Sequence, residues 1–157
     1  MAEGDATFVG AVPDIYDRFM VPMLFEPYAV DMAARVVAVK PTHVLETAAG
    51  RGVVTRVLAP LLPADAVYVV SDLNPPMLER ARLRQPADAR IEWATADALN
   101  LQFPDASFEV VCCQFGVMFF PDRAKGYAEA LRVLRPGAPF IFNAWGSLAD
   151  NSISGAV

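Results

Sequence analysis

Four polar side chains stand at the ends of separate apolar segments, and their chemical types suit a nucleotide-like ligand. Glu46 and Asp72 each close a short apolar run, Asp97 follows a third run, and Gln114 lies near the end of a fourth. A carboxylate placed as Asp72 is can accept hydrogen bonds from both hydroxyls of a ribose. If the four segments are parallel strands, their carboxyl ends meet at one edge of a sheet, so we expect these side chains to gather there.

A glycine-bearing turn after Glu46 is the second feature of the predicted site. Residues 44–52 have the sequence VLETAAGRG, in which Gly50 and Gly52 let backbone N–H groups approach a ligand closely. The dinucleotide fingerprint requires a third glycine, but Thr55 occupies that position. Dinucleotide-binding loops also usually lack an acid where Glu46 stands. The turn therefore favours a nucleotide-like ligand other than a dinucleotide.

The elements that must position these residues alternate between strand and helix from residue 41 onward. Before that point, the sequence predicts two helical segments, over residues 14–24 and 28–39. The predicted strands are 43–47, 67–71, 90–94, 108–115 and 139–144, and the predicted helices between them are 53–61, 76–84 and 123–134. Residues 97–105 are expected to form a loop with at most a short turn.

This alternation predicts the fold class. Strands that are apolar throughout, such as residues 109–113, are expected where helices cover both faces of a sheet. Strands that alternate with helices give a mostly parallel sheet. We therefore expect an α/β, Rossmann-like fold with helices on both faces and a ligand site at the carboxyl ends of the strands.

Composition and charge narrow the function classes. The chain has 157 residues and a net charge of −5, which disfavours binding to the phosphate backbone of nucleic acids. No run approaches the roughly 18 apolar residues of a membrane span, and the first residues carry acid where a signal peptide would carry positive charge. We therefore expect a cytoplasmic protein.

The cysteines and the histidine give no sign of a metal site. Cys112 and Cys113 are adjacent, match no metal-ligand spacing and are expected to be reduced core residues. His43 is the single histidine, so the sequence excludes catalysis by a histidine pair and a histidine-cluster metal site. His43 is expected to have a structural or surface role, because it precedes the first strand at the end opposite the predicted site.

Four motifs, taken in order, resemble those of class I S-adenosylmethionine-dependent methyltransferases. The similarity is closest to the methyltransferase type 11 group, which includes ubiquinone and menaquinone biosynthesis enzymes. It extends over about residues 8–150. The motifs are VLETAAGRG at 44–52, SDLNPPML at 71–78, ADA at 96–98 with LQFPDASF at 101–108, and LRVLRPG at 131–137.

The resemblance implies a cofactor, S-adenosyl-L-methionine, and assigns it binding residues. Glu46 and the backbone of residues 48–50, with Ala48 and Gly50, would hold its amino-acid end, together with Gly52. Asp72 would accept from the ribose hydroxyls. The remaining assignments are Leu73 and Met77 beside the adenine, Asp97 at the exocyclic amine, the N–H of Ala98 at a ring nitrogen, Gln114 and Phe115 at the transfer site, and Tyr16 and Arg18 on a helix that closes over the cofactor.

Two departures from the family pattern qualify the resemblance. Ala48 replaces the first glycine of the loop, which is compatible with the loop only if its φ is negative. The family sheet has seven strands, and this chain offers five, so we expect the order 3-2-1-4-5 with strands six and seven missing.

The expected division is a helical cap over 1–40 and an incomplete cofactor-binding domain over 41–157. Residues 139–145 would then form an apolar edge strand, which predicts either a fragment or a homo-oligomer through that edge.

Three functions follow as alternatives. The first is a methyltransferase that acts on a small-molecule acceptor by in-line displacement, with no catalytic base identified. The second is a cofactor-binding or assembly module without turnover. The third is a nicotinamide-dependent oxidoreductase, which the acid at Glu46 and the missing third glycine disfavour.

Overall fold

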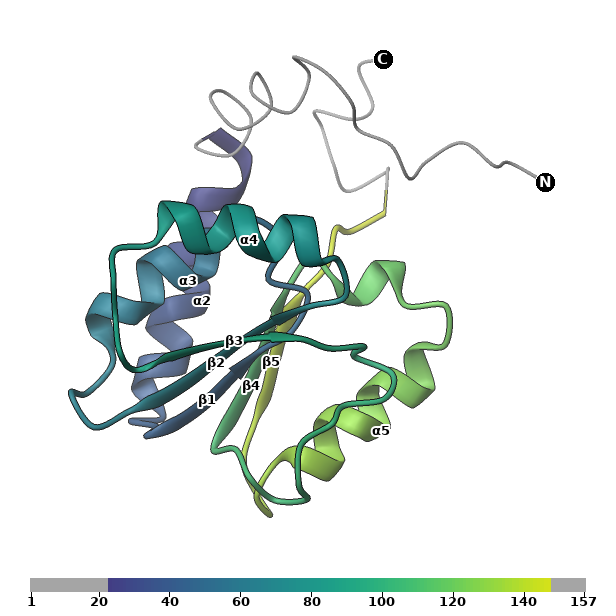
Figure 1. Ribbon diagram of the computed structural model, residues 1–157. Helices are drawn as coiled ribbons and strands as arrows, with labels where there is room; N and C mark the ends of the chain where they lie inside the picture. The colour runs from purple at the N-terminus through teal and green to yellow at the C-terminus, as the bar shows by residue number, and fades with distance from the viewer. Residues whose placement is uncertain (1–22, 148–157) are drawn as a thin grey trace, which may run out of the picture.

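A computed structural model describes residues 23–147 and confirms the predicted fold class. Five strands form one parallel sheet in the order β3-β2-β1-β4-β5, with helices on both faces (Figure 1). In chain order the elements are α2 Glu26–Ala38, β1 His43–Glu46, α3 Val53–Leu58, η2 Ala59–Leu61, β2 Val67–Asp72, α4 Pro75–Arg84, β3 Ile91–Thr95, β4 Val110–Gln114, η3 Val117–Phe119, α5 Arg123–Val133 and β5 Phe140–Asn143.

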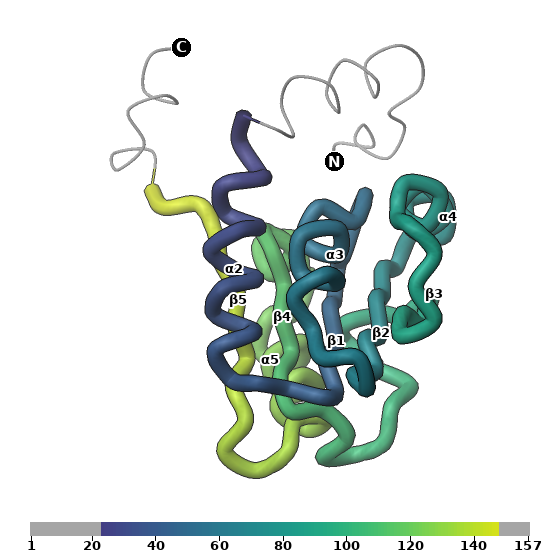
Figure 2. The backbone as a smooth tube through the Cα atoms, turned by 90° about the vertical axis from the view of Figure 1, so that its left-hand side faces the viewer, coloured from purple at the N-terminus to yellow at the C-terminus, as the bar shows by residue number. Residues whose placement is uncertain are grey.

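Alternation of side chains along the central strands divides the core between the two faces of the sheet. Val44, Tyr68 and Val110 face a layer that contains α2 and α3, whereas Leu45 and Val111 face α5. Figure 2 views the sheet with α2 and α3 in front of it and α5 behind. Both layers are apolar, which explains why the central strands lack a polar face.

Helix α2 is part of this sandwich. Its residues Ala29, Met32, Ala33 and Val36 are buried in the same core cluster as α3 and the central strands. The helix begins two residues before the predicted start, because Pro27 fits the first turn of a helix. The predicted division of the chain at residue 40 stays a prediction, and the predicted helix over 14–24 lies almost wholly outside the described residues.

Local sequence explains where the other helices begin and end. The side chains of Asn74 and Asp122 cap α4 and α5 by accepting hydrogen bonds from Met77 N at 3.3 Å and Lys125 N at 3.0 Å. The predicted helix over 53–61 ends in a tighter 3₁₀ turn, because Pro60 cannot donate to an α-helical hydrogen bond. Residues 23–147 contain no helix with the length and apolar character that a bilayer crossing requires.

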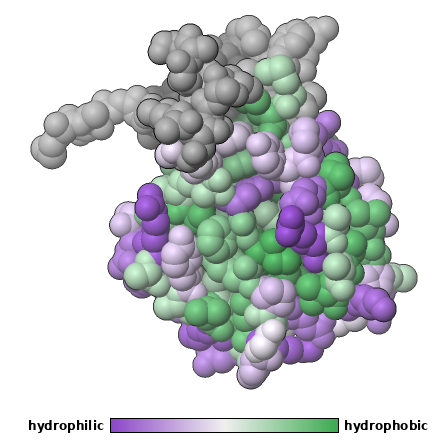
Figure 3. Space-filling model, turned by 180° about the vertical axis from the view of Figure 1, so that it is seen from behind, coloured by the Kyte–Doolittle hydropathy of each residue, from purple (hydrophilic) through white to green (hydrophobic). Residues whose placement is uncertain are grey.

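The fifth strand lies at one edge of the sheet. It pairs with β4 on one side only, in a register that sets Phe140 beside Val111 and Asn143 beside Gln114. Phe142 is 44% exposed, and Tyr127 of α5 stacks on it with ring centroids 5.6 Å apart. Figure 3, which shows the molecule from behind, displays hydrophobic surface across the middle of this face.

Candidate functional site

Parallel pairing brings the polar ends of the strands to one rim, as predicted. Glu46 is the last residue of β1, Asp72 the last of β2 and Gln114 the last of β4, while Asp97 follows β3 by two residues. Because β1 lies between β2 and β4, the rim is centred on Glu46. The sheet thus positions four side chains that are up to 68 residues apart in sequence.

The turn after Glu46 is anchored to the end of β2. Ala49 N donates to Ser71 O at 2.9 Å, and Gly50 N donates to the Asp72 Oδ2 atom at 2.8 Å. Gly50 has a φ of +56°, and a Cβ atom placed there would meet nothing within 4 Å. The turn therefore presents backbone to open space beside Asp72, as a site for a close-fitting ligand requires.

Packing within the protein explains why the second glycine of the turn, Gly52, is a glycine. Gly52 has a φ of +72°, and a Cβ atom there would lie 3.0 Å from the Cβ of Ala81 in α4. Close packing of α4 on the start of α3 therefore requires glycine at this position. The assignment of Gly52 to the cofactor stays a prediction, and within the protein the group that lies close to Gly52 is Ala81 of α4.

The expectation that the loop requires a negative φ at Ala48 was wrong, whereas the assignment of Ala48 to the cofactor stays a prediction. The φ of Ala48 is +51°, in the left-handed region that an alanine adopts only at a cost in energy. Gly116, after β4, lies against it: a Cβ atom on Gly116 would be only 2.5 Å from the Ala48 Cβ. The turn keeps the backbone that suits glycine even though the sequence supplies alanine, because its hydrogen bonds to β2 fix the path of the chain.

Asp72 is held in place by two backbone donors. Its Oδ2 atom accepts from Gly50 N, and its Oδ1 atom accepts from Asn74 N, each at 2.8 Å. A carboxylate has about four lone-pair sites, so both oxygens can accept further hydrogen bonds. Leu73, the next residue, is 67% exposed, and Met77 in the first turn of α4 is half-buried.

Glu46 is enclosed by the protein. Its side chain is 2% exposed, and its Oε2 atom accepts hydrogen bonds from the hydroxyls of Tyr68 and Thr55, the latter at 2.7 Å. Its Oε1 atom accepts no hydrogen bond from the residues that the structure describes. Burial raises the pKa of the Glu46 carboxyl to about 7, although both hydroxyl donors act to lower it.

Sequence reasoning missed Tyr68 and the role of Thr55. Tyr68 lies in β2 on the same face as Val70, which pairs with Glu46 in register. A buried tyrosine needs a partner for its hydroxyl, and Tyr68 is the one aromatic residue in β2, flanked by valines on both sides. That requirement, combined with the period-two pattern, was the signal that could have joined Tyr68 to Glu46.

Asp97 and Ala98 lie on a short turn after β3. Asp97 is exposed; its Oδ1 atom accepts from Leu99 N at 2.9 Å, and its backbone O accepts from Asn100 N at the same distance. Ala96 N donates to Asp72 O at 3.0 Å, which joins this turn to the end of β2. Within the described residues, Ala98 N donates to no protein acceptor.

Gln114 and Phe115 end β4 beside an aromatic cluster. The Nε2 atom of Gln114 donates to Phe25 O at 3.2 Å, whereas its Oε1 atom is buried and accepts nothing from the described part of the chain. Phe115 has a φ of +53°, and its N–H donates to the Asn143 Oδ1 atom at 2.8 Å. The Trp145 ring stacks on Phe115 with centroids 4.3 Å apart.

The edges of two more rings complete this cluster. Phe25 and Tyr28, from the start of α2, meet Phe115 edge to face at centroid distances of 5.8 Å and 5.1 Å. The cluster therefore joins the start of α2 to the carboxyl ends of β4 and β5. Tyr16 and Arg18, which were predicted to close over the cofactor, lie outside the described residues.

The cysteines and the histidine have structural environments. Cys112 and Cys113 are free and buried, and burial raises the pKa of both thiols, to about 11 for Cys113. His43 begins β1, at the end of the strand opposite Glu46, and its Nδ1 atom lies 3.0 Å from the Thr42 hydroxyl. Within residues 23–147, no group of three or more potential ligands is arranged to hold a metal ion.

A known protein family matches most of the residues that the structure describes. The methyltransferase domain family matches residues 45–142, which contain the turn, Asp72, Asp97 and Gln114. The chain belongs to this family. Its motifs are those of the S-adenosylmethionine-dependent, type 11 group, and its sheet has the strand order expected for that fold.

Relatives of this methyltransferase domain include two methyltransferases whose names contain a quinone or a hydroquinone. The demethylmenaquinone methyltransferase of Deinococcus radiodurans is 40% identical over 110 residues, which are 69% of this chain and 45% of that protein. The 2-methyl-6-phytyl-1,4-hydroquinone methyltransferase of Synechocystis is 31% identical over 71% of this chain and 35% of its own length. The chain thus spans less than half the length of these two relatives.

Solved structures show the same fold. A crystal structure from Methanococcus maripaludis aligns with a TM-score of 0.72 over 92% of this chain and 67% of that one. Because the two sequences are 21% identical, this likeness shows the fold alone.

Proposed function

We propose that this chain binds S-adenosyl-L-methionine at the rim formed by β1, β2, β3 and β4 and transfers its methyl group to a small-molecule acceptor. The observation that carries the proposal is the Asp72 carboxylate, which Gly50 N and Asn74 N hold at the tip of β2. Both oxygens keep lone pairs for a ribose diol, and the Gly50 backbone beside them faces open space.

The other rim residues fit the remaining parts of this cofactor. The Oε1 atom of Glu46 is the acceptor we assign to the cofactor ammonium group, with the backbone of residues 48–50 beside it. Asp97 would accept from the exocyclic amine of adenine, and Ala98 N would donate to a ring nitrogen. Leu73 and Met77 supply apolar surface for the base.

The chemistry requires little from the protein beyond placement. S-adenosylmethionine supplies an activated methyl group on its sulfonium, and transfer is an in-line displacement. The chain aligns the reactants, for which effective molarities of about 10⁵–10⁸ M are the relevant scale. A general base is needed only for an acceptor that must lose a proton, and we assign none within residues 23–147.

For the acceptor we propose an aromatic, apolar small molecule of the hydroquinone type. Support comes from the rings of Phe25, Tyr28, Phe115 and Trp145 at the carboxyl ends of β4 and β5, since aromatic rings favour offset or edge-to-face contact with one another. The names of the two quinone-related relatives point to the same class. Transfer of a labelled methyl group to a naphthohydroquinone, with a small aliphatic amine as the comparison acceptor, tests this assignment.

Calorimetric titration tests the cofactor site. The folded chain should bind S-adenosylhomocysteine and not NADH. Asp72→Ala should raise the dissociation constant about 10- to 150-fold, the range for losing hydrogen bonds to a charged group. Asp65→Ala is the matched control, because Asp65 is exposed and precedes β2 at the opposite end of the strand. Unchanged affinity in a folded Asp72 variant would refute the ribose assignment, and a folded wild-type chain that binds neither ligand would refute the proposal.

A further inference from the structure

The segment between β3 and β4 forms no regular helix or strand, but side chains of α5 make hydrogen bonds to it. Asp97 and Asn100 form an isolated bridge, and no helix or strand follows until Val110. Within this segment Leu101 is 4% exposed and packs into the core that lies between the sheet and α5. Since the proposed adenine contacts, Asp97 and Ala98, lie four and three residues before Leu101, their position depends on what fixes Leu101.

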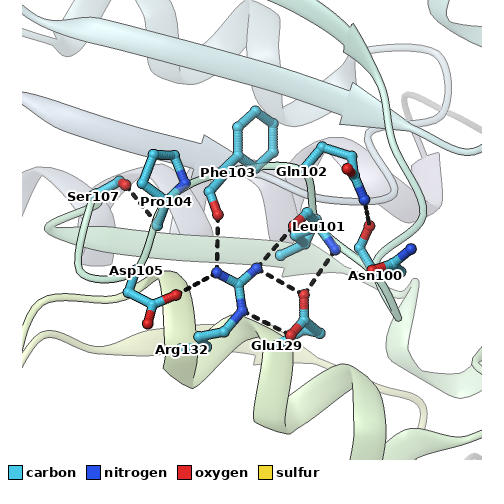
Figure 4. Close-up of polar contacts among 9 residues, drawn as sticks. All are labelled: Asn100, Leu101, Gln102, Phe103, Pro104, Asp105, Ser107, Glu129 and Arg132. Atoms are coloured by element: carbon cyan, nitrogen blue, oxygen red, sulfur yellow. Dashed lines mark hydrogen bonds and ion pairs between the residues drawn. The ribbon is translucent and has the colours of Figure 1, made fainter.

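A single arginine of α5 binds the segment at three places. Arg132 donates to Leu101 O at 2.8 Å, to Phe103 O at 2.9 Å and to the Asp105 Oδ1 atom at 2.6 Å (Figure 4). The guanidinium group has five N–H donors in a fixed plane, so it can bridge several acceptors at once. A lysine at this position has one nitrogen and could not reproduce this geometry.

Glu129, one helical turn before Arg132, completes the arrangement. Its Oε1 and Oε2 atoms accept from Arg132 at 2.8 Å and 2.9 Å, and Oε2 also accepts from Leu101 N at 2.8 Å. The backbone N–H and C=O of Leu101 are therefore both bound by this pair (Figure 4). Arg132 lowers the pKa of the Glu129 carboxyl, as expected for a carboxylate that stays ionised beside a cation.

The turn that carries Asp97 is thus held from both ends. On its N-terminal side, Ala96 N donates to Asp72 O. On its C-terminal side, Leu101 is bound by Arg132 and Glu129. The first anchor belongs to the rim itself, whereas the second comes from a helix that contributes no residue to the proposed cofactor contacts.

From this arrangement we propose that Arg132 and Glu129 are positioning residues that set the selectivity of the site for adenine. The inference rests on the proposed function. Arg132 and Glu129 do not touch the base; they hold Leu101, and through the turn from residue 97 to residue 100 they hold the Asp97 carboxylate and the Ala98 N–H at the base. Discrimination of a purine by its exocyclic amine requires such an acceptor at a fixed place.

The test compares two ligands that differ at the exocyclic amine. S-adenosylhomocysteine carries it, and S-inosylhomocysteine carries a carbonyl oxygen in its place. The wild-type chain should prefer the adenine ligand about tenfold or more, the value of a hydrogen bond to a charged acceptor. Arg132→Met should weaken binding of the adenine ligand about tenfold and bring the two affinities within about twofold. Arg132→Lys should lose most of the preference as well.

The matched control is Arg135→Met. Arg135 follows α5 and pairs with Glu109, so its loss removes an arginine–carboxylate pair without touching the segment from Asp97 to Ser107. This variant should keep the wild-type preference. Glu129→Gln provides a milder change if Arg132→Met does not fold, and it should reduce the preference in the same direction.

Hydrogen exchange gives a readout without any ligand. The amides of Leu99, Asn100 and Leu101, which each donate a hydrogen bond, should exchange at least tenfold faster in Arg132→Met than in wild type, and at the wild-type rate in Arg135→Met. Equal weakening of both ligands, or no change in their ratio in a folded variant, would overturn the positioning role while leaving the cofactor proposal intact. A folded wild-type chain that binds neither ligand would overturn both.

Discussion

At the scale of single residues, burial separates the two acids that end β1 and β2. Glu46 accepts from side-chain hydroxyls and is almost inaccessible, whereas Asp72 accepts from backbone N–H groups and is partly exposed. Direct contact with a polar ligand is therefore expected at Asp72. Glu46 can reach a ligand only through Oε1, and its charge carries a desolvation cost that Asp72 largely avoids.

The buried carboxyl of Glu46 should make stability depend on pH. Its pKa is raised to about 7, above the unfolded value, so between about pH 4.5 and pH 7 the folded chain binds more protons than the unfolded chain. Stability from this group is therefore present at low pH and is lost as pH rises through 7. Between pH 5 and pH 8 the wild type should lose about 2–3 kcal/mol of unfolding free energy because of this group, and Glu46→Gln should not show this loss.

Urea unfolding of the wild type and Glu46→Gln at pH 5, 6, 7 and 8 measures this difference. Glu79→Gln is the control, because Glu79 is exposed on α4, and its profile should parallel that of the wild type. Parallel profiles for the wild type and Glu46→Gln would contradict the raised pKa.

At the scale of elements, the turn after β1 and the turn after β4 are packed against each other. A Cβ atom on Gly116 would lie 2.5 Å from the Ala48 Cβ and 2.7 Å from the Cys113 Sγ atom. These distances are far shorter than ordinary contacts, so the close approach of the two turns leaves no room for a side chain at Gly116. The position of Phe115, which precedes Gly116, depends on this contact.

Two substitutions test the contact between these turns. Gly116→Ala should destabilise the fold by about 1–3 kcal/mol, the usual cost of overpacking. Ala48→Gly should stabilise it by about 0.5–1 kcal/mol, because glycine adopts the φ of +51° without strain. In the double variant the cost of Gly116→Ala should be smaller, since one of the two close atoms has been removed.

A double-mutant cycle by chemical denaturation measures the coupling between Ala48 and Gly116. If the effects of the two substitutions on the unfolding free energy were strictly additive, there would be no energetic coupling between Ala48 and Gly116.

At the scale of the whole molecule, β5 is one of the two edge strands of the sheet, and it is the more apolar of the two. Its outer side has no neighbouring strand within residues 23–147, and Phe142 is 44% exposed. The face of the molecule seen in Figure 3 carries hydrophobic surface across its middle. An unpaired edge can add a strand from another chain, and two identical edges can pair about a two-fold axis. The prediction that this chain self-associates through β5 follows from these properties.

Phe142→Lys should weaken that association at least tenfold, because a lysine on an edge strand opposes pairing. Sedimentation velocity over a concentration series measures it. Leu83→Lys is the control, since Leu83 is exposed on α4, which packs near β3 at the other edge of the sheet. A wild-type chain that stays monomeric at high concentration would disprove the prediction.

Sequence patterns alone predicted the fold class and placed the rim residues at the ends of strands, and the resemblance to the methyltransferase family supplied the strand order. Hydrophobic runs at strand length, separated by helical patterns, have one common solution, a parallel sheet covered on both faces. Once the strands are parallel, their last residues must share one rim, so Glu46, Asp72 and Gln114 could be placed from local pattern and motif spacing.

Only the tertiary structure decided the contacts that cross between elements. Three examples are the φ of Ala48, the hydrogen bond from Tyr68 to Glu46 and the binding of Leu101 by Arg132. Each depends on residues between 20 and 70 positions apart or on the path that neighbouring strands impose on the chain. Local propensity contains no information about such pairs. They arise when packing forces buried polar groups to find partners, and packing is a property of the whole fold.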